Sequence, residues 1–550
     1  MYKNKQKVIF FSVIFLLGSI TVLTISTSFH SQIAIDYDST SLKTSATFTD
    51  VEINALATTN TSNTGNWTWA KSIGLCTGSG TLGSPYIIAN HVFEYSSGVG
   101  NCLTIINSRV YFRIRDCTFR NSAFSFVGLL IVNSTNGEVT DCSIYGNYEG
   151  IVMADVNDTE IRDSHIYGNN DIGLILVNSR FNTINNNNVS ANTEWGIILA
   201  TSMYNTISNN IANDNLNEDG ITLDIESNYN DVNFNTANNN GNAGIFLDDS
   251  HRNTISNNKA NDNFQFGISL DISTRNIISK NTVNSNNIMG ILGVDSDTNL
   301  ISQNTANHHS VAGIYLENCD DSTISDNTVY NNTIMGIYMV NLNNMTCTDN
   351  LAYENKMWGI YLYNSDESVI ENNNAHHNNF YGIYINSGSQ VNVIKSNLAR
   401  YNNLSGIYIQ SSSNNLLIDN IASYNVEHGI FIESSNNIVL SSNTANDNEE
   451  NGIHLLNSNS NTIISNTANN NKNGTFLDGS NNNKVIDNVF VGNDDCYNET
   501  GSTGNIFENN RCSAPGGLPI DLSTILLILA IVEGAVIAVI ALTYFVRKRK

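Results

Sequence analysis

Proline is nearly absent from this chain of 550 residues, which carries only Pro85, Pro515 and Pro519. Proline lacks a backbone N–H, so strands that are hydrogen-bonded on both edges exclude it. The long stretch between Pro85 and Pro515 therefore favours a stack of internal strands.

Charged residues are also scarce, and basic ones most of all. They make up 14% of the chain, against about a quarter in ordinary soluble proteins, and Asn, Ser and Thr take their place. The 50 carboxylates outnumber the 25 Lys and Arg residues, which gives a net charge of −25. Such a chain repels nucleic acid and anionic lipid, so we expect no nucleic-acid partner and favour cations or neutral sugars as ligands.

Long apolar runs occur only near the two ends. Lys3, Lys5 and Lys7 precede the apolar run 8–25, which predicts a signal peptide or an uncleaved signal anchor within residues 1–35. The two alternatives stay open, because no clear cleavage site follows the run.

The second apolar run, residues 525–546, is long enough to span a bilayer, and the basic tail 547–550 is expected to stay in the cytoplasm. We therefore expect a protein of the cell membrane that crosses it once, or twice if the first signal is not cleaved, with its middle outside the cell. Small residues around Glu533 further predict self-association within the membrane.

The middle of the chain repeats with a period of about 23 residues. Each repeat begins with glycine, an apolar residue, a variable residue and a second apolar residue, the alternation of a strand with one buried face. The anchor glycines are Gly128, Gly150, Gly173, Gly196, Gly220, Gly244, Gly267, Gly290, Gly313, Gly336, Gly359, Gly382, Gly406, Gly429, Gly452 and Gly474.

Asparagine recurs in two columns of this repeat. Typical members are Asn304, Asn327 and Asn350 in the first column and Asn263 and Asn286 in the second, which His309 interrupts. Stacked amides can bond head to tail, whereas carboxylates about 4.8 Å apart would repel by about 3.5 kcal/mol. A disordered Asn-rich tract would not keep this phase, and a leucine-rich repeat would need leucines where Ser, Thr and Asn stand.

The pattern Gly-Ile-x-Leu followed by Asn-Thr-Ile-Ser-x-Asn-x-Ala resembles the parallel β-helix repeats of the NosD-like family, which are shared with carbohydrate-binding proteins and sugar hydrolases. The resemblance implies an all-β fold, a single-stranded right-handed parallel β-helix of about 18 coils. We expect the β-helix over residues 86–512, a polar lead-in and N-terminal cap over 36–85, and a linker over 513–524. The resemblance says little about function, because the family hosts adhesins, lyases and hydrolases.

Aromatic residues gather at the second position after the later anchor glycines, which should point outward. We expect an exposed aromatic ribbon that binds a polysaccharide or glycoprotein surface, because aromatic faces suit sugar rings. The alternative is a structural ladder, in which each cross-coil pair stabilises the sheet by about 0.2–1 kcal/mol. The predicted ligand-binding residues are Tyr315, Tyr338, Tyr361, Tyr384, Tyr408, Phe431 and Trp358.

An acid strip, Asp224, Asp248 and Asp271, forms a second outward column two residues further along, with Asp249 beside it. Stacked surface carboxylates repel by about 1 kcal/mol per neighbour. Three interpretations stay open: a solvated acidic edge, a Ca²⁺ site made by these four residues, or the catalytic acids Asp224, Asp248 and Asp271 of a lyase or hydrolase.

Histidines do not predict a copper site, so calcium is the one cofactor considered. His308 and His377 share a column but lie three coils apart, about 14 Å. His428 and His454 lie in neighbouring coils at different phase.

The eight cysteines of an exported chain suggest disulfides. Cys117 and Cys142 are predicted to stack within disulfide reach. Two further pairs, Cys76 with Cys102 and Cys496 with Cys512, would close the two ends of the repeat region. Cys319 and Cys347 are out of phase and are left unpaired.

We therefore expect a membrane-anchored cell-surface protein that binds glycans or a neighbouring surface through the ribbon. The alternatives are a polysaccharide lyase or glycoside hydrolase that uses the acid strip, and a structural spacer or metal-binding NosD-like protein. The nearly constant repeat length shows no inserted loops that would wall an active-site cleft, which weighs against an enzyme.

Overall fold

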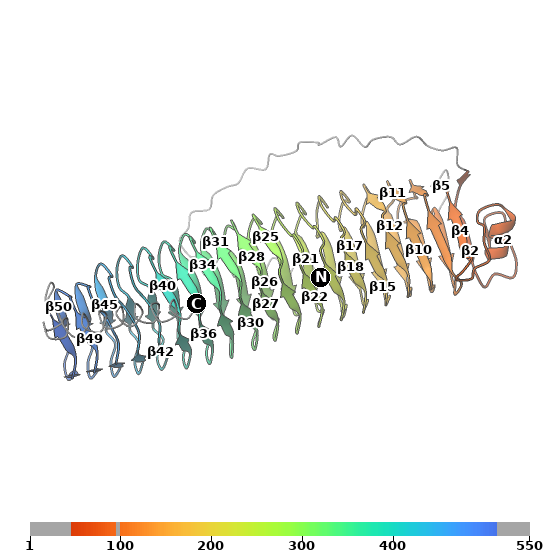
Figure 1. The fold of residues 1–550 in the computed structure, drawn as a ribbon. Coiled ribbons are helices and arrows are strands. Elements are labelled where there is room, and N and C mark those ends of the chain that lie inside the picture. The colour runs from red at the N-terminus through yellow and green to blue at the C-terminus, as the bar shows by residue number, and fades with distance from the viewer. Residues whose placement is uncertain (1–45, 95–99, 514–550) are drawn as a thin grey trace, which may run out of the picture. The chain divides into compact units, whose positions relative to one another are not determined.

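The computed structural model describes residues 46–94 and 100–513. These residues form a β-helix whose strands stack along one axis, from β2 (Val51–Asn54) at one end to β50 (Asp495–Thr500) at the other (Figure 1). The predicted apolar segments 8–25 and 525–546 lie outside the described residues. Within the described ranges, no helix is long and apolar enough to cross a membrane.

Each coil contributes one strand to each of three parallel sheets. In one coil these strands are β26 (Met289–Val294) in the first sheet, β27 (Leu300–Ser302) in the second and β28 (Thr305–Asn307) in the third. The next coil begins with β29 (Ala312–Glu317), which pairs with β26 so that Ile291 lies beside Ile314. In some coils a single β-bridge replaces the third strand.

Residues at the same position of successive repeats are therefore neighbours in adjacent coils, as predicted. Asn304 Nδ2 donates to Asn327 Oδ1 at 3.0 Å, and Asn327 Nδ2 donates to Asn350 Oδ1 at 3.0 Å. Each Nδ2 also donates to a backbone carbonyl, such as that of Ile278. Because the ladder satisfies both ends of every amide, the side chains can be 1% exposed without an unpaired polar group.

Two further polar ladders run along the rod, and the sequence analysis missed both. One is made mainly of serines, in which Ser227 N donates to Ser250 Oγ at 3.2 Å. The other contains Asn182, Asn205 and Asn230, with Nδ2 of Asn205 donating to Asn230 Oδ1 at 3.1 Å. Both ladders lie where the chain turns from the first sheet to the second. Short polar side chains, rather than apolar ones, pack inside this turn.

Inside the ladders lies a continuous apolar core of Ile, Leu, Val and Ala. The anchor glycines are needed because neighbouring coils approach closely beside them. A Cβ atom on Gly336 would lie 2.5 Å from the carbonyl oxygen of Gly359 and 2.8 Å from Asn355 Nδ2. No larger residue fits there without moving backbone.

The β-helix begins earlier than the predicted boundary at residue 86. Strand β1 (Thr47–Phe48) already pairs with β5 (Val92–Glu94), and β2 pairs with β6 (Leu103–Ile106). The short helix α2 (Trp67–Ser72) lies at this end (Figure 1). Its Trp67 is buried, stacks on Tyr86 at 4.8 Å and donates to Ser108 Oγ, so the predicted cap includes a helix.

At the other end, the predicted disulfide between Cys496 and Cys512 is confirmed; it links β50 to β52 (Arg511–Ser513). The predicted pairs Cys117–Cys142 and Cys76–Cys102 are wrong, because all four cysteines are buried thiols that form no disulfide. Cys117 and Cys142 do lie together, and their thiols are hydrogen-bonded to each other. Each thiol also contacts a backbone carbonyl, that of Arg115 for Cys117 and that of Thr140 for Cys142.

Candidate functional site

The aromatic ribbon forms as a stack, but the expectation that it is exposed is wrong. Tyr338, Tyr361 and Tyr384 are each 7% exposed. Their ring centroids are 4.7 Å apart with interplanar angles of 4° and 11°, so every ring covers the faces of its neighbours. A sugar that stacks on aromatic rings needs a free face, and the interior of this stack offers none.

The polar edges of the ribbon are also occupied. Tyr384 Oη donates to Gln410 Oε1 at 2.6 Å, and Tyr408 Oη donates to Glu433. Burial raises the pKa of Tyr361 to about 12. Trp358 packs against Tyr361 and Tyr384. The ribbon is therefore a stabilising ladder on the outer surface of the first sheet.

The acid strip lies in the predicted register, since Asp224 pairs with Asp248 and Asp248 with Asp271. Asp249 contacts His251 Nε2 at 3.5 Å. Among the described residues, no group of three or more His, Cys, Asp or Glu side chains could hold a metal ion. The four predicted calcium ligands, Asp224, Asp248, Asp249 and Asp271, therefore do not form such a group by their carboxylates alone.

Asp219 lies close to the acid strip and was missed because an apolar residue usually precedes the anchor glycine. It is 1% exposed, and burial raises the pKa of its carboxyl group to about 6. Asn242 Nδ2 and the backbone N–H of Ala243 donate to its Oδ1, and Thr222 Oγ1 donates to its Oδ2. A buried carboxyl group in an otherwise neutral interior marks this part of the first sheet as unusual.

The expectation that His428 and His454 are kept apart by their phase is wrong. His454 Nδ1 lies 3.1 Å from His428 Nε2, and burial lowers the pKa of both rings, to about 4 and about 3. Because Asn451 N–H donates to His428 Nδ1, the remaining proton of neutral His428 points to His454. The pair is thus held as two neutral, hydrogen-bonded rings.

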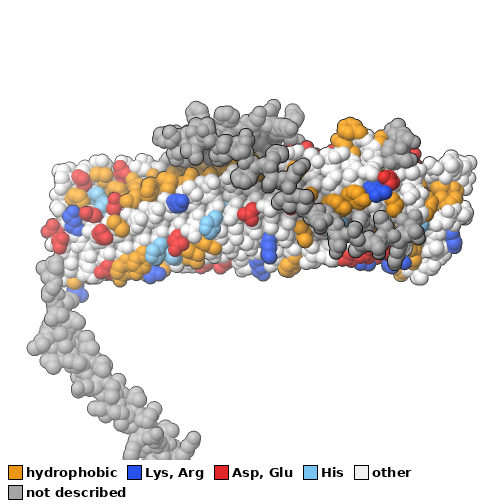
Figure 2. Space-filling model, turned by 90° about the horizontal axis from the view of Figure 1, so that it is seen from above, with side chains coloured by type: hydrophobic (Ala, Val, Ile, Leu, Met, Phe, Trp, Pro, Cys, Tyr) orange, Lys and Arg blue, Asp and Glu red, His pale blue; other side chains and the backbone are white. Residues whose placement is uncertain are grey.

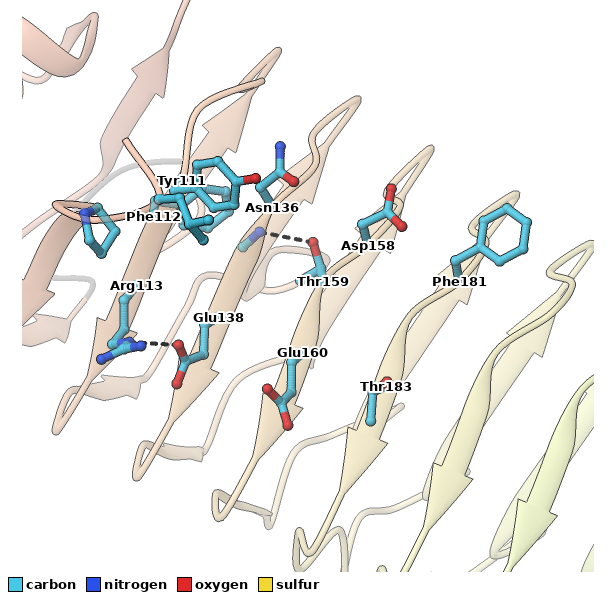
Figure 3. Close-up of a pocket in the computed structure, with 13 residues that line it drawn as sticks. Tyr111, Phe112, Arg113, Asn136, Glu138, Asp158, Thr159, Glu160, Phe181 and Thr183 are labelled. Carbon is cyan, nitrogen blue, oxygen red and sulfur yellow. Dashed lines mark hydrogen bonds and ion pairs between the residues drawn. The ribbon is translucent and has the colours of Figure 1, made fainter. Parts of the chain in front are cut away.

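One candidate site is a groove at the N-terminal end of the rod, here called the cap groove. It encloses about 380 Å³, within the usual range for small-ligand sites. Leu82 and Pro85 of the cap region are among its lining residues. Tyr111 lies at one end of the groove and Phe181 at the other (Figure 3). Asn136 and Asp158 lie in the turns between them. The outer face of the second sheet forms the floor.

The position of Phe181 gives the cap groove an open aromatic face. Phe181 is 57% exposed and stacks at 5.4 Å on Tyr204, which stacks in turn on Tyr229. Phe181 is the first ring of this stack, and the shorter Asp158 occupies the turn beside it on the groove side. The ring therefore presents one face to the groove, unlike the rings inside the ribbon.

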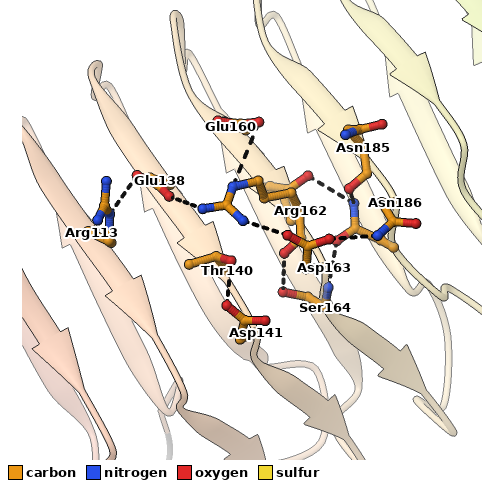
Figure 4. Close-up of polar contacts among 12 residues, drawn as sticks. Arg113, Glu138, Thr140, Asp141, Glu160, Arg162, Asp163, Ser164, Asn185 and Asn186 are labelled. Atoms are coloured by element: carbon orange, nitrogen blue, oxygen red, sulfur yellow. Dashed lines mark hydrogen bonds and ion pairs between the residues drawn. The ribbon is translucent and has the colours of Figure 1, made fainter.

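Charged side chains on three neighbouring strands form the floor of the cap groove. The strands are β7 (Phe112–Arg115), β10 (Gly137–Thr140) and β13 (Glu160–Arg162). Arg113 Nε contacts Glu138 Oε2 at 2.6 Å, and Arg162 Nη2 contacts Glu138 Oε1 at 2.7 Å (Figure 4).

Arg162 extends this network to the next turn. It binds Asp163, which also accepts a hydrogen bond from Asn186 Nδ2 at 2.6 Å. Hydrogen bonds from Asn186 and Arg162 lower the pKa of Asp163, and those to Asp163 and Glu138 raise the pKa of Arg162. Arg113, Glu138 and Glu160 line the floor, and Arg162 and Asp163 beside it continue the array of alternating charges, which can hydrogen-bond a polar ligand.

The sequence analysis missed the cap groove, although a signal was present. Six arginines lie between residues 109 and 180, and Arg113, Glu138 and Glu160 occupy a strand position that is Thr in many later repeats. On the described part of the face seen in Figure 2, charged side chains are scattered among backbone and uncharged polar side chains, and hydrophobic side chains form runs along the axis. A local break in composition within a regular repeat would have located the site.

The sequence matches the family described as the right-handed beta helix region three times, over residues 97–246, 232–367 and 358–512. No curated protein matches it.

Among solved structures, similar folds include the Dettilon tailspike protein, with 14% identity, a TM-score of 0.37, and coverage of 55% of this chain and 62% of the tailspike. The A-module of the Azotobacter vinelandii mannuronan C-5 epimerase AlgE4 has 13% identity, a TM-score of 0.32, and coverage of 70% and 89%. A variant of the periplasmic alginate epimerase AlgG has 14% identity, a TM-score of 0.30, and coverage of 78% and 84%. At these values the likeness says nothing about activity.

Proposed function

Because this chain belongs to the right-handed β-helix family, we propose that it is a membrane-anchored, glycan-binding protein of the cell surface. The cap groove is the binding site, and the apolar segment 525–546 is the anchor. The observation that carries the proposal is the open face of Phe181 at one end of a floor of fixed charges. A sugar ring can stack on Phe181 while its hydroxyl groups bond to Asp158 and Glu160, and a following sugar unit of the same chain can reach Arg113, three coils away.

Binding is favoured over catalysis in the cap groove. Each carboxylate oxygen of Glu138 already accepts from a guanidinium group. A glycosidase needs a carboxylic acid that can protonate the leaving oxygen, and both oxygens of Glu138 are already engaged by Arg113 and Arg162. The groove therefore supplies orientation and hydrogen bonds without a proton donor at its centre.

A lyase or hydrolase that uses the acid strip is the second candidate, and Asp219 is the observation that favours it. A pKa of about 6 suits a general acid. Asp219 lies next to β19 (Ile221–Asp224), the strand that carries the first aspartate of the strip. A substrate would have to open access to this buried group before it could act.

The binding proposal is tested by Phe181→Asn in the full-length protein, held in a neutral detergent and applied to a glycan array with and without Ca²⁺. Asn suits the left-handed backbone of this turn (φ 57°) and occupies the equivalent position at Asn136. We expect affinity for the retained glycans to fall about tenfold, which corresponds to about 1.4 kcal/mol of lost stacking.

Tyr229→Asn is the matched control, because it removes a ring of the same stack at the end away from the cap groove. It should leave glycan binding unchanged. Equal retention by the Phe181 variant and the unaltered protein would refute the proposed site. Depolymerisation of a bound glycan that Asp219→Asn abolishes would instead support the enzyme.

A further inference from the structure

A second cavity, of about 510 Å³, lies on the turn that leads into the first sheet and is separate from the cap groove. Leu216 and Phe264 form its two walls and are 67% and 65% exposed. Gly241 lies between them, one coil from each, so the walls are about 10 Å apart. We call this cavity the Gly241 slot.

The slot exists because one coil lacks a side chain where its neighbours carry large ones. The backbone keeps its register, since Gly241 N–H donates to Asn215 O at 2.8 Å and Phe264 N–H donates to Asn240 O at 3.0 Å. A Cβ atom on Gly241 would lie 2.2 Å from Leu216 O, so glycine is required at this position. The gap between Leu216 and Phe264 is therefore fixed by the backbone of these three coils.

One edge of the slot is acidic. Asp214, Asn239 and Asp262 lie in consecutive coils, each two residues before the corresponding wall or floor residue. Burial raises the pKa of Asp214, and a hydrogen bond with Asn239 opposes this effect. Within residues 46–94 and 100–513, no Lys or Arg lines the slot, so these carboxylates lack a cationic partner there.

From these observations, we infer that the Gly241 slot binds a basic side chain, lysine or arginine, presented by a partner protein. The aliphatic stem would lie over Gly241 between Leu216 and Phe264, and the cationic head would reach Asp214 and Asp262 around Asn239. The slot requires an apolar group between its walls and a cation at its acidic edge. Lysine and arginine side chains supply both, because they carry a charged tip on an apolar stem. Phe264 adds a ring face to which a cation is attracted.

Charge complementarity selects this occupant over a neutral sugar. Sugar hydroxyl groups could hydrogen-bond to the two carboxylates but would not neutralise their charge, whereas a lysine or arginine head does both. The net charge of −25 also attracts basic surfaces to the rod from a distance. The site thus goes beyond glycan binding and provides a separate contact for a protein.

The test measures binding of fluorescein-labelled tetralysine to the full-length protein in neutral detergent, by fluorescence anisotropy at 150 mM salt. The double variant Asp214→Asn with Asp262→Asn should raise the Kd at least tenfold. Phe264→Asn, which copies Asn287 of the next coil, should raise it at least threefold through loss of one wall. The same peptide acetylated on its lysines should not bind.

The matched control is Asp326→Asn with Asp447→Asn, which changes the net charge equally at sites away from the slot. It should shift the Kd less than twofold. If the two double variants weaken binding equally, the peptide responds to net charge and the inference fails. It also fails if Phe264→Asn leaves the Kd unchanged, because the stem would then not lie between the walls.

Discussion

Asn327→Asp is expected to destabilise the central coils by about 3–5 kcal/mol, the cost of a buried charge without a partner. In the native ladder, Asn327 Oδ1 accepts from both the backbone N–H and Nδ2 of Asn304. Its Nδ2 donates to Ile301 O at 2.9 Å and to Asn350 Oδ1 at 3.0 Å. Aspartate would place an oxygen against both of these acceptors.

Hydrogen exchange of the full-length protein is the appropriate measurement, because long repeat arrays unfold in parts. Amides of residues 301–350 should lose protection in the variant, while the coils near α2 keep theirs.

The matched control is Asn341→Asp, at an exposed turn with φ 55°. There Oδ1 accepts from Asn364 Nδ2 at 2.8 Å, a role that aspartate retains. Its effect should stay within about 0.5 kcal/mol. Equal loss of protection in both variants would show that the ladder does not distinguish an amide from a carboxylate.

The second large effect concerns pH and His309, which replaces asparagine in the second ladder. His309 is 1% exposed, and burial lowers its pKa to about 4. Its Nε2 faces Val283 O at 2.8 Å and its Nδ1 faces Asn286 O at 3.1 Å. A neutral ring carries one N–H, so one of these carbonyls faces a lone pair.

The sign of the pH effect follows from the lowered pKa. Between about pH 6.5 and pH 4 the unfolded chain binds a proton at this histidine and the folded protein does not, so stability falls as the pH falls. A shift of this size corresponds to about 3 kcal/mol, fully present above pH 6.5 and lost towards pH 4.

His309→Asn should restore the ladder and remove this pH dependence. The measurement is hydrogen exchange of residues 286–332 between pH 7 and pH 4, corrected for the intrinsic exchange rates. His165→Asn, which removes an exposed imidazole, is the control and should keep the profile of the unaltered protein. A profile of the His309 variant that still declines towards pH 4 would assign the effect to other groups.

The fold could be predicted from the sequence because period and hydrogen bonding are local properties. An asparagine that returns every 22–24 residues can pair only if coils stack in register, which the contact from Asn304 to Asn327 confirms. Exposure could not be predicted in the same way. The position of Tyr361 faces outward as expected, yet the neighbouring rings at coil spacing cover both of its faces.

The cap groove was beyond prediction for a different reason. Leu82 precedes Phe181 by about four coils of sequence, and only the path of the cap region brings both to one cavity. Cys117 and Cys142 show a related limit: residues that share a column are neighbours, but a hydrogen-bonded pair of thiols does not have to form a disulfide.

The asparagine ladders also share one polarity. In the continuous ladder that runs from Asn187 to Asn510, every Oδ1 faces the preceding coil and every Nδ2 up to that of Asn488 donates to the next one, so the amide dipoles add along the axis as they do in an α-helix. The positive, N–H end of this array lies at the last coil, where Asn505 Nδ2 of a neighbouring ladder donates to Glu499 Oε1 at 2.6 Å. The ladder therefore has a net dipole along the axis of the β-helix. The Glu499 carboxylate lies at its positive end, as acidic residues do at the N-terminus of an α-helix.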